Sequence, residues 1–444
     1  MFCILLNKER KIIMLPKKTA LWDSVSLNVI NTDKFKTAMI FFSLRTKKDK
    51  PLAADRLLLP GILRRGTVEY PSAARLNLEL DNLYASTVEI KLSHLGKNEL
   101  LTFSAEMLDN SFVTDGTDIL DGVVKIIAEM ILHPITDGES FPADTVKKER
   151  ASVLDSLKAE INNPKTYAAA RCAELLHGAD PEVSSIGELI DGVEKTDGAS
   201  TYRVYRNILE HAALDVYYVG ALDGEQVADS IKRHFATFKP SATPAAPVSA
   251  EHFTKLKEVT EPFPVSQSKL SLGFRVGVCS TDRYYYAAIL FNEIFGGSPA
   301  SKLFMNVRER MGLCYYCSSH YDSYFGNITV SSGVDAESAD LAKAEILAQL
   351  EDMKAGRISE VEFSAAKLAF EHYCRQTYDY PFDIFTFYRS RGVLGIETTL
   401  EEHLKNITAV TLDEVVAVAN FVKLDTVYLL RGTLSAEGEE EYDE

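Results

Sequence analysis

Apolar and polar residues alternate along the chain in patterns that predict the same series of strands and helices twice. In the first half, two strands turn near residues 31–35, and a later hairpin at 86–107 turns at the segment HLGKN. Helices are predicted at 52–65, 73–84, 118–133 and 140–162, and a further strand at 213–222. This half therefore mixes a sheet with several amphipathic helices.

The second half repeats this order. Its predicted elements are a strand at 266–277, helices at 284–297 and 301–312, a hairpin at 313–334, and helices at 340–356 and 359–376. Corresponding hairpins are offset by roughly 230 residues, which indicates one duplicated unit. We expect an α+β fold of two homologous halves, each a mostly antiparallel sheet covered by helices on one face.

A Pro- and Ala-rich stretch at 238–253 divides the chain near its midpoint and is typical of an interdomain linker. The predicted organisation is an N-terminal extension at 1–22, an N-terminal domain at 23–237, the linker, a C-terminal domain at 254–434 and an acidic tail at 435–444. Within the extension, Met14 offers an alternative start.

Composition and charge narrow the classes of function. The chain is 46% hydrophobic and 25% charged, and no apolar run is long enough to span a bilayer. The net charge of −16 argues against nucleic-acid binding, which needs a basic surface. The apolar start is too short and too charged for a signal peptide, so we expect a cytoplasmic location and no membrane partner.

Six irregularly placed cysteines do not suggest a disulfide framework. Cys314 and Cys317 form a single CxxC, which can be a redox or zinc pair. The surrounding segment LCYYCSSHY favours a strand, on which residues three apart point to opposite faces. We therefore predict that these two thiols do not share a ligand.

The helix at 52–65 contains an anomaly, because Pro60 and Gly61 are adjacent in its apolar stripe. Proline removes a backbone donor and glycine weakens a helix. This pair is unexpected in a helix whose apolar stripe otherwise consists of leucine and isoleucine.

The segments LRRGTVEYPS, NLYASTVEIKLS and SKLFMNVRERMGLCYYCSSHYDSYFGNITVSSGVD resemble the pitrilysin/insulinase (M16) family of zinc peptidases. The resemblance covers about residues 23 to 433 and implies the LuxS/M16 metallopeptidase-like fold. The chain is also similar to short bacterial M16-like proteins whose name links them to aminopentanol modification of a translation elongation factor. Those proteins look catalytically empty and are encoded beside a zinc-binding relative.

Active members of this family carry the motif His-x-x-Glu-His on a helix that runs into a turn ending Gly-Thr, and the motif's histidines bind zinc while its glutamate polarises the bound water. If that turn is aligned on Gly66 and Thr67, the motif positions hold non-ligands. These degenerate zinc-site positions are Leu57, Pro60 and Gly61, with Ser156 at the place of the family's later glutamate ligand. The resemblance thus implies that the zinc site is lost and that this chain binds no metal.

The histidines give a separate argument. No two of the nine are close enough in sequence to share a helical face, so no local zinc motif is present. Asp155 and Glu160, near Ser156, are most simply solvated charges on a helix rich in Lys and Glu. A site assembled from distant residues remains an alternative.

Family members also carry an arginine and a tyrosine seven residues apart, which hold the substrate backbone and hydrogen-bond the carbonyl as it becomes an oxyanion. Arg308 and Tyr315 match this pattern in RERMGLCY. Arg310 and Tyr316 are the alternatives if the alignment shifts, and a structural role for an exposed arginine and a core tyrosine is the competing interpretation.

The leading hypothesis is a non-catalytic subunit of a heterodimeric zinc peptidase. The implied partner is a zinc-bearing M16 paralogue with an intact His-x-x-Glu-His, and the implied substrate is a peptide or unfolded polypeptide that adds as a strand to a sheet edge inside a chamber. The alternatives are a non-proteolytic scaffold or maturation factor on the same fold, and a zinc peptidase with a relocated site.

Overall fold

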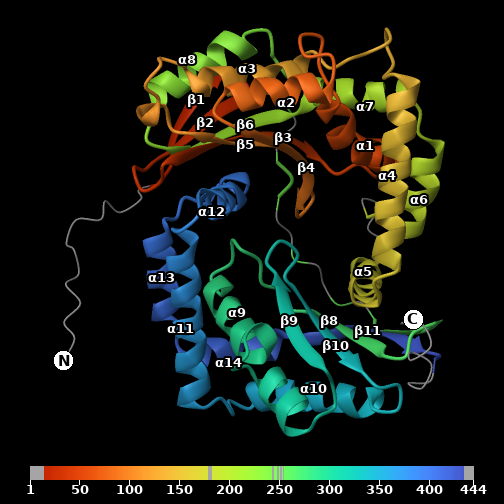
Figure 1. The fold of residues 1–444 in the computed structure, drawn as a ribbon. Coiled ribbons are helices and arrows are strands. Elements are labelled where there is room, and N and C mark those ends of the chain that lie inside the picture. Colours follow the sequence, from red (N-terminus) through yellow and green to blue (C-terminus); the bar gives the residue numbers. More distant parts are fainter. Residues whose placement is uncertain are drawn as a thin grey trace, which may run out of the picture.

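The computed structural model describes residues 15–178, 183–242, 245–247, 250, 253 and 255–434. Met14 and the acidic tail at 435–444 lie outside the described residues. The described chain forms two halves, each a sheet with helices packed on it (Figure 1). The predicted α+β class is thereby confirmed.

The N-terminal sheet has the strand order β1-β2-β6-β3-β5-β4. Its strands are β1 (Lys17–Trp22), β2 (Val25–Asn31), β3 (Thr37–Lys47), β4 (Thr87–Leu95), β5 (Asn98–Leu108) and β6 (Ala213–Gly220). β1 pairs with β2, so residues 17–22, which the sequence assigned to an extension, belong to this sheet. β2 and β3 are not neighbours, because β6 lies between them, parallel to β2 and antiparallel to β3.

Helices of this half connect and cover the strands. They are η1 (Lys50–Leu52), α1 (Ala53–Arg64), α2 (Ala73–Asn82), η2 (Asn110–Phe112), α3 (Ile119–Leu132), α4 (Ala143–Ile161), α5 (Pro164–His177), α6 (Ile186–Lys195), α7 (Gly198–His211) and α8 (Gly224–Phe235). α2, α3 and α8 lie on the outer face of the sheet (Figure 1). Side chains of α3 and α8, including Ile127 and Ile231, are fully buried against it.

The C-terminal sheet has the order β7-β11-β8-β10-β9, which is the N-terminal order without its first strand. Its strands are β7 (Lys257–Phe263), β8 (Ser268–Arg275), β9 (Tyr316–Asp322), β10 (Asn327–Val334) and β11 (Lys423–Gly432). β7 and β11 are parallel, as are β2 and β6, whereas the other pairs are antiparallel. This shared topology agrees with the predicted duplication.

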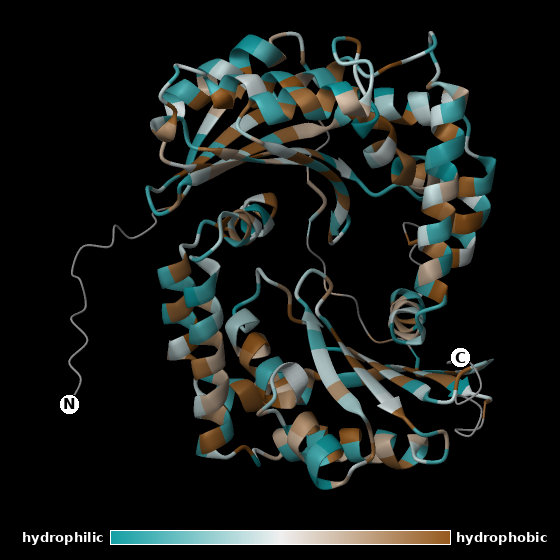
Figure 2. Cartoon of the chain, in the orientation of Figure 1, coloured by the Kyte–Doolittle hydropathy of each residue, from teal (hydrophilic) through white to brown (hydrophobic). Residues whose placement is uncertain are grey.

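Its helices follow the same plan. They are α9 (Tyr285–Asn292), η3 (Glu293–Gly297), η4 (Leu303–Arg310), α10 (Ala339–Lys354), α11 (Glu360–Thr377), α12 (Pro381–Val393), α13 (Leu400–Ala409) and α14 (Leu412–Phe421). In Figure 2, hydrophobic and hydrophilic residues are interleaved along these helices, as expected for helices with one buried face. No helix within the described ranges is long and apolar enough to cross a membrane.

Two helices pass from one half to the other, which the sequence analysis did not anticipate. α5 packs on β8 and β11 of the C-terminal sheet, where Ala168 and Cys172 are buried against Tyr428. α12 packs on β3 and β6 of the N-terminal sheet, where the rings of Phe385 and Phe41 stack with their centroids 3.6 Å apart. Each sheet is therefore covered by its own helices on one face and contacted by a helix of the other half on the opposite face (Figure 1).

Candidate functional site

The positions predicted for the degenerate zinc motif, Leu57, Pro60 and Gly61, lie on α1, which is a continuous helix despite the internal Pro60. Leu58, Leu59, Ile62 and Leu63 are 0–3% exposed and point into the N-terminal core. The motif positions Leu57, Pro60 and Gly61 lie on the other, half-buried face. The helix is thus held by its core stripe, which tolerates a proline on the opposite face.

Glu149 of α4 fills the space beside Gly61. It is 7% exposed, and a Cβ built on Gly61 would lie 1.8 Å from its Oε2. Arg65 Nε donates to Glu149 Oε1 at 2.5 Å, so the buried carboxylate is neutralised by a guanidinium. A side chain at position 61 cannot share this space with the carboxylate, and Arg65 already supplies the positive charge that Glu149 needs.

Ser156 and Leu57 also offer no metal ligand. Ser156 is exposed, and its hydroxyl donates to the carbonyl of Ser152 in its own helix at 3.0 Å. Leu57 lines a cavity of about 210 Å³ together with His94 and Glu99. The residues present at these four positions therefore do not fit a zinc ion.

His94 and Glu99 are the titratable groups of that cavity. Desolvation, together with the positive charges of Lys48 and Arg56, lowers the pKa of His94 to about 4. Burial raises the pKa of Glu99, although Arg56, which donates to Glu99 at 2.6 Å, opposes this shift. In the part of the chain that the structure describes, no group of three or more His, Cys, Asp or Glu side chains could hold a metal ion.

Arg308 and Tyr315 lie together at the end of η4 and the start of β9. Arg308 Nε donates to the carbonyl oxygen of Tyr315 at 2.9 Å, and its guanidinium lies over the ring of Phe304. Tyr315 is 60% exposed, and its hydroxyl donates to Asp335 at 3.4 Å. An exposed phenol such as that of Tyr315 can donate to a peptide carbonyl.

The two alternative residues have other neighbours. Arg310 faces Glu345 of α10 at 3.8 Å, and the ring of Tyr316 lies under the ammonium of Lys165 from α5. Only Arg308 is joined to the segment that carries the exposed tyrosine. As a match to the arginine and tyrosine pattern of the family, the geometry therefore favours Arg308 and Tyr315 over Arg310 and Tyr316.

The two cysteines of the CxxC do not point to opposite faces, as strand alternation predicted. Cys314 precedes β9 rather than lying on it, and the backbone bends at Tyr315. Both side chains are buried in the hydrophobic core of the C-terminal half. Strand alternation does not apply to Cys314, because this residue lies outside the strand, and the expectation that the two thiols share no ligand stays a prediction.

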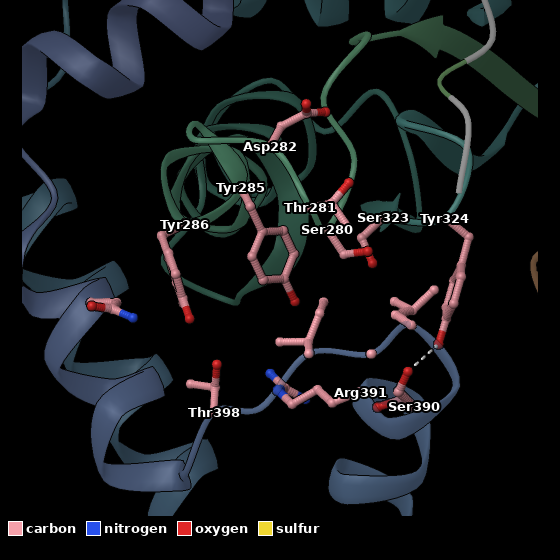
Figure 3. Close-up of a pocket in the computed structure, with 14 residues that line it drawn as sticks. Ser280, Thr281, Asp282, Tyr285, Tyr286, Ser323, Tyr324, Ser390, Arg391 and Thr398 are labelled. Atoms are coloured by element: carbon pink, nitrogen blue, oxygen red, sulfur yellow. Dashed lines mark hydrogen bonds between the residues drawn. The ribbon is translucent and has the colours of Figure 1, made fainter. Parts of the chain in front are cut away.

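A polar pocket of about 510 Å³ in the C-terminal half was not anticipated (Figure 3). Its walls carry the hydroxyls of Tyr285, Tyr286, Tyr324, Ser280 and Thr281. Tyr324 donates to the carbonyl of Ser390, as the dashed line in Figure 3 shows. The three consecutive tyrosines at 284–286 could have indicated this pocket, although the same residues are equally compatible with the start of a helix.

Both charged residues of this pocket are engaged. Arg391 donates to Phe387 and contacts both ring nitrogens of His403, at 2.9 and 3.0 Å. Asp282 accepts the backbone N–H of Cys279 at 2.6 Å. The pocket consequently offers hydroxyl groups rather than a free charge to a ligand.

Comparisons with known proteins decide the family. The chain is 30% identical over 412 residues to "Probable inactive metalloprotease YmfF" of Bacillus subtilis, covering 93% of this chain and 97% of that protein. The family model described as "Peptidase M16 inactive domain" matches residues 201–370. The chain belongs to the M16 peptidase family.

Other M16-like proteins are similar at lower identity. "Uncharacterized zinc protease YmxG" of Bacillus subtilis is 24% identical over 303 residues, 66% of this chain and 70% of that protein. Among solved structures, a conserved protein from Enterococcus faecalis superposes with a TM-score of 0.88 at 26% identity, covering 94% of this chain and 99% of that chain. A peptidase M16 inactive domain from Pseudomonas fluorescens gives a TM-score of 0.77 at 16% identity over 95% and 99% of the two chains, which shows the shared fold.

Proposed function

We propose that this M16 chain is a zinc-less, non-catalytic subunit of a heterodimeric metallopeptidase, in which it forms half of the peptide-binding chamber. The observation that carries the proposal is the contrast between two sites on one chain. The motif face of α1 is filled by Glu149 and Arg65, whereas Tyr315 is exposed and bonded through its carbonyl to Arg308.

In this proposal the chain binds and orients substrate. The Tyr315 hydroxyl donates to a substrate carbonyl, and that hydrogen bond strengthens as the oxygen becomes negative. Arg308 holds the substrate backbone near it. Zinc and the activation of water belong to the partner, a zinc-bearing M16 paralogue with an intact His-x-x-Glu-His.

The substrate class follows from the sheets. β4 and β9 are edge strands, each hydrogen-bonded to one neighbour within the described sheets. An extended peptide can add to such an edge through main-chain hydrogen bonds, which tolerate many sequences. We therefore propose peptides or unfolded polypeptides as substrates. A cytoplasmic location is part of the proposal and rests on the sequence alone.

The test is reconstitution with an M16 chain from the same genome that carries the intact motif. Turnover of a fluorogenic peptide is measured with the wild-type chain and with Arg308→Ala, Tyr315→Phe and Arg310→Ala. Tyr315→Phe should lower turnover by roughly 10²-fold, as expected for loss of one oxyanion donor, and Arg308→Ala should also lower it. Arg310→Ala is the matched control, because this arginine faces Glu345 and should leave turnover unchanged.

If Tyr315→Phe and Arg308→Ala both support wild-type turnover, these two residues do not bind substrate. The chain would then act as a scaffold or maturation factor on the M16 fold. A complex that forms but shows no turnover with any version of the chain would point the same way.

A further inference from the structure

A β-bulge brings the two cysteines of the CxxC to one side of the C-terminal sheet. The N–H of Tyr315 donates to the carbonyl of Gly333 at 2.9 Å, while Tyr316 is the direct strand partner of the same Gly333. Two residues thus oppose one, which shifts the alternation of side chains by one position. Cys314 therefore shares a face with Cys317.

The two thiols form a small buried cluster with a serine. Cys314 is 7% exposed and Cys317 is 3% exposed. Cys317 is the strand partner of Ser332, which is fully buried and whose hydroxyl has no hydrogen-bond partner among the described residues. Both thiols belong to the hydrophobic core of the C-terminal half, and Cys314 directly precedes the exposed Tyr315 in the chain.

The environment makes the two sulfur atoms unequal. The neighbouring Cys317 thiol and the guanidinium of Arg308 lower the pKa of Cys314 to about 7, against the opposing effect of burial. The neighbouring Cys314 and burial raise the pKa of Cys317. A thiolate is the reactive form of cysteine, so Cys314 is the nucleophile of the pair and Cys317 the resolving thiol.

Two of the other buried cysteines, Cys172 and Cys374, behave differently. Burial raises the pKa of Cys172 to about 12 and that of Cys374 to about 11. A metal pair is not supported either, because the described residues place no third His, Cys, Asp or Glu ligand with these two thiols. The arrangement fits a dithiol better than a zinc site.

We propose that Cys314 and Cys317 are a redox pair that forms an intramolecular disulfide by exchange with a low-molecular-weight disulfide such as oxidised glutathione. The Cys314 thiolate attacks one sulfur of the small disulfide, forming a mixed disulfide and releasing one glutathione thiolate. Cys317 then loses its proton and attacks the Cys314 sulfur, closing the protein disulfide and releasing the second glutathione. The two cysteines are oxidised and the two glutathione sulfurs are reduced.

The disulfide has a consequence for the neighbouring residue, and this part rests on the proposed function. A bonded sulfur pair is much closer than two thiols in contact, since an S–S bond is about 2.05 Å long. Closing it draws Cys314 toward β9 and moves Tyr315, whose carbonyl holds Arg308. Oxidation therefore changes the placement of the proposed substrate-binding pair.

The disulfide is tested on the folded full-length chain in glutathione buffers of increasing oxidised fraction. After acid quenching, alkylation and tryptic digestion, mass spectrometry follows the peptide of residues 311–343, whose only cysteines are this pair. The proposal expects this peptide to lose two hydrogens reversibly, while Cys172 and Cys374 remain reduced and serve as internal controls. A peptide that stays fully alkylated in oxidised glutathione alone would overturn the redox pair.

Two variants test the order of attack. Cys317→Ser should accumulate a glutathione adduct on Cys314, because the resolving thiol is missing, whereas Cys314→Ser should accumulate none on Cys317. The opposite pattern would contradict the assignment of Cys314 as nucleophile. If either variant does not fold, the wild-type redox titration still decides whether the disulfide forms.

Turnover of the reconstituted complex separates the redox site from its consequence. Oxidation should change turnover several-fold with the wild-type chain and leave a Cys314→Ser, Cys317→Ser double variant unaffected. If the disulfide forms, Tyr315→Phe lowers turnover and oxidation does not, the coupling to Tyr315 is refuted. If Tyr315→Phe has no effect at all, the proposed function fails, while the mass spectrum still decides the redox pair.

Discussion

At residue scale, the packing of α1 depends on Gly61 and on two side chains outside the predicted motif positions, Glu149 and Arg65. Gly61 leaves the space that the carboxylate of Glu149 occupies, and Arg65 pairs with that carboxylate. The adjacent Pro60 lies on the same half-buried face, away from the core stripe. The glycine is therefore required by a close contact, and the proline is tolerated because core packing holds the helix.

We predict that Gly61→Ala destabilises the chain by about 1–3 kcal/mol, because the new methyl group must push Glu149 away from Arg65. Urea denaturation measures the change in the free energy of unfolding. In a Glu149→Ala background the same substitution should cost much less, and this coupling identifies the contact. Equal costs in both backgrounds would show that Glu149 does not occupy this space.

His403 makes the free energy of unfolding depend on pH. It is 3% exposed, and burial together with the charge of Arg391 lowers its pKa to about 3. Because the folded-state pKa lies below the unfolded value of 6.5, the unfolded chain binds a proton that the folded chain does not. The contribution of His403 to the free energy of unfolding is therefore fully present above about pH 6.5 and is lost as the pH falls toward about 3.

The expected slope from this group is about 1 kcal/mol per pH unit between about pH 6 and pH 5. Measuring the free energy of unfolding against pH for wild type and His403→Gln should show a shallower slope in the variant. His94 shifts in the same direction and remains in both proteins. Parallel slopes would contradict a neutral buried His403.

At element scale, the hydrophobic pattern predicted the elements that depend on nearby residues in the sequence. The hairpin β4–β5 and the helices α1 and α3 lie where hydrophobic periodicity placed them. The position of β6 between β2 and β3 could not be predicted, because a strand about 170 residues away competes for both edges through backbone hydrogen bonds that leave no local signal. The bulge at Tyr315 was missed for a similar reason, since its partner Gly333 lies on another strand.

α12 was not foreseen as a link between the halves, since its aromatic residues are equally compatible with a helix of one core. In the structure Phe385 is 1% exposed and stacks on Phe41 of β3, whereas Phe382 of the same helix is 45% exposed. The helix therefore contributes to the cohesion of the two halves.

We predict that Phe385→Ala lowers the free energy of unfolding by about 3–5 kcal/mol, because it removes a fully buried ring from the contact between halves. Phe382→Ala is the comparison, because its ring also contacts Phe41, with centroids 6.1 Å apart, but is 45% exposed, so this substitution should cost less than half as much. Urea denaturation followed by circular dichroism measures both. Equal losses would show that the burial of Phe385 against Phe41 does not determine the strength of the contact between the halves.

At the scale of the whole molecule, the two sheets share one topology, and the crossing helices α5 and α12 join the two halves. The helix α1 is a structural element of the N-terminal half, while Tyr315 in the other half is exposed. The sequence alone shows that the residues at the predicted motif positions are not zinc ligands. The roles of Glu149 and Arg65 could not be predicted, because filling a space depends on three-dimensional packing.

The most direct measurement is zinc content and peptide turnover of the purified chain, alone and mixed with an M16 chain from the same genome that carries His-x-x-Glu-His. We predict no stoichiometric zinc and no turnover for the chain alone, and turnover by the mixture that exceeds that of the neighbour alone. Stoichiometric zinc and peptide cleavage by the chain alone would contradict the proposed non-catalytic role and require a ligand set other than the α1 positions.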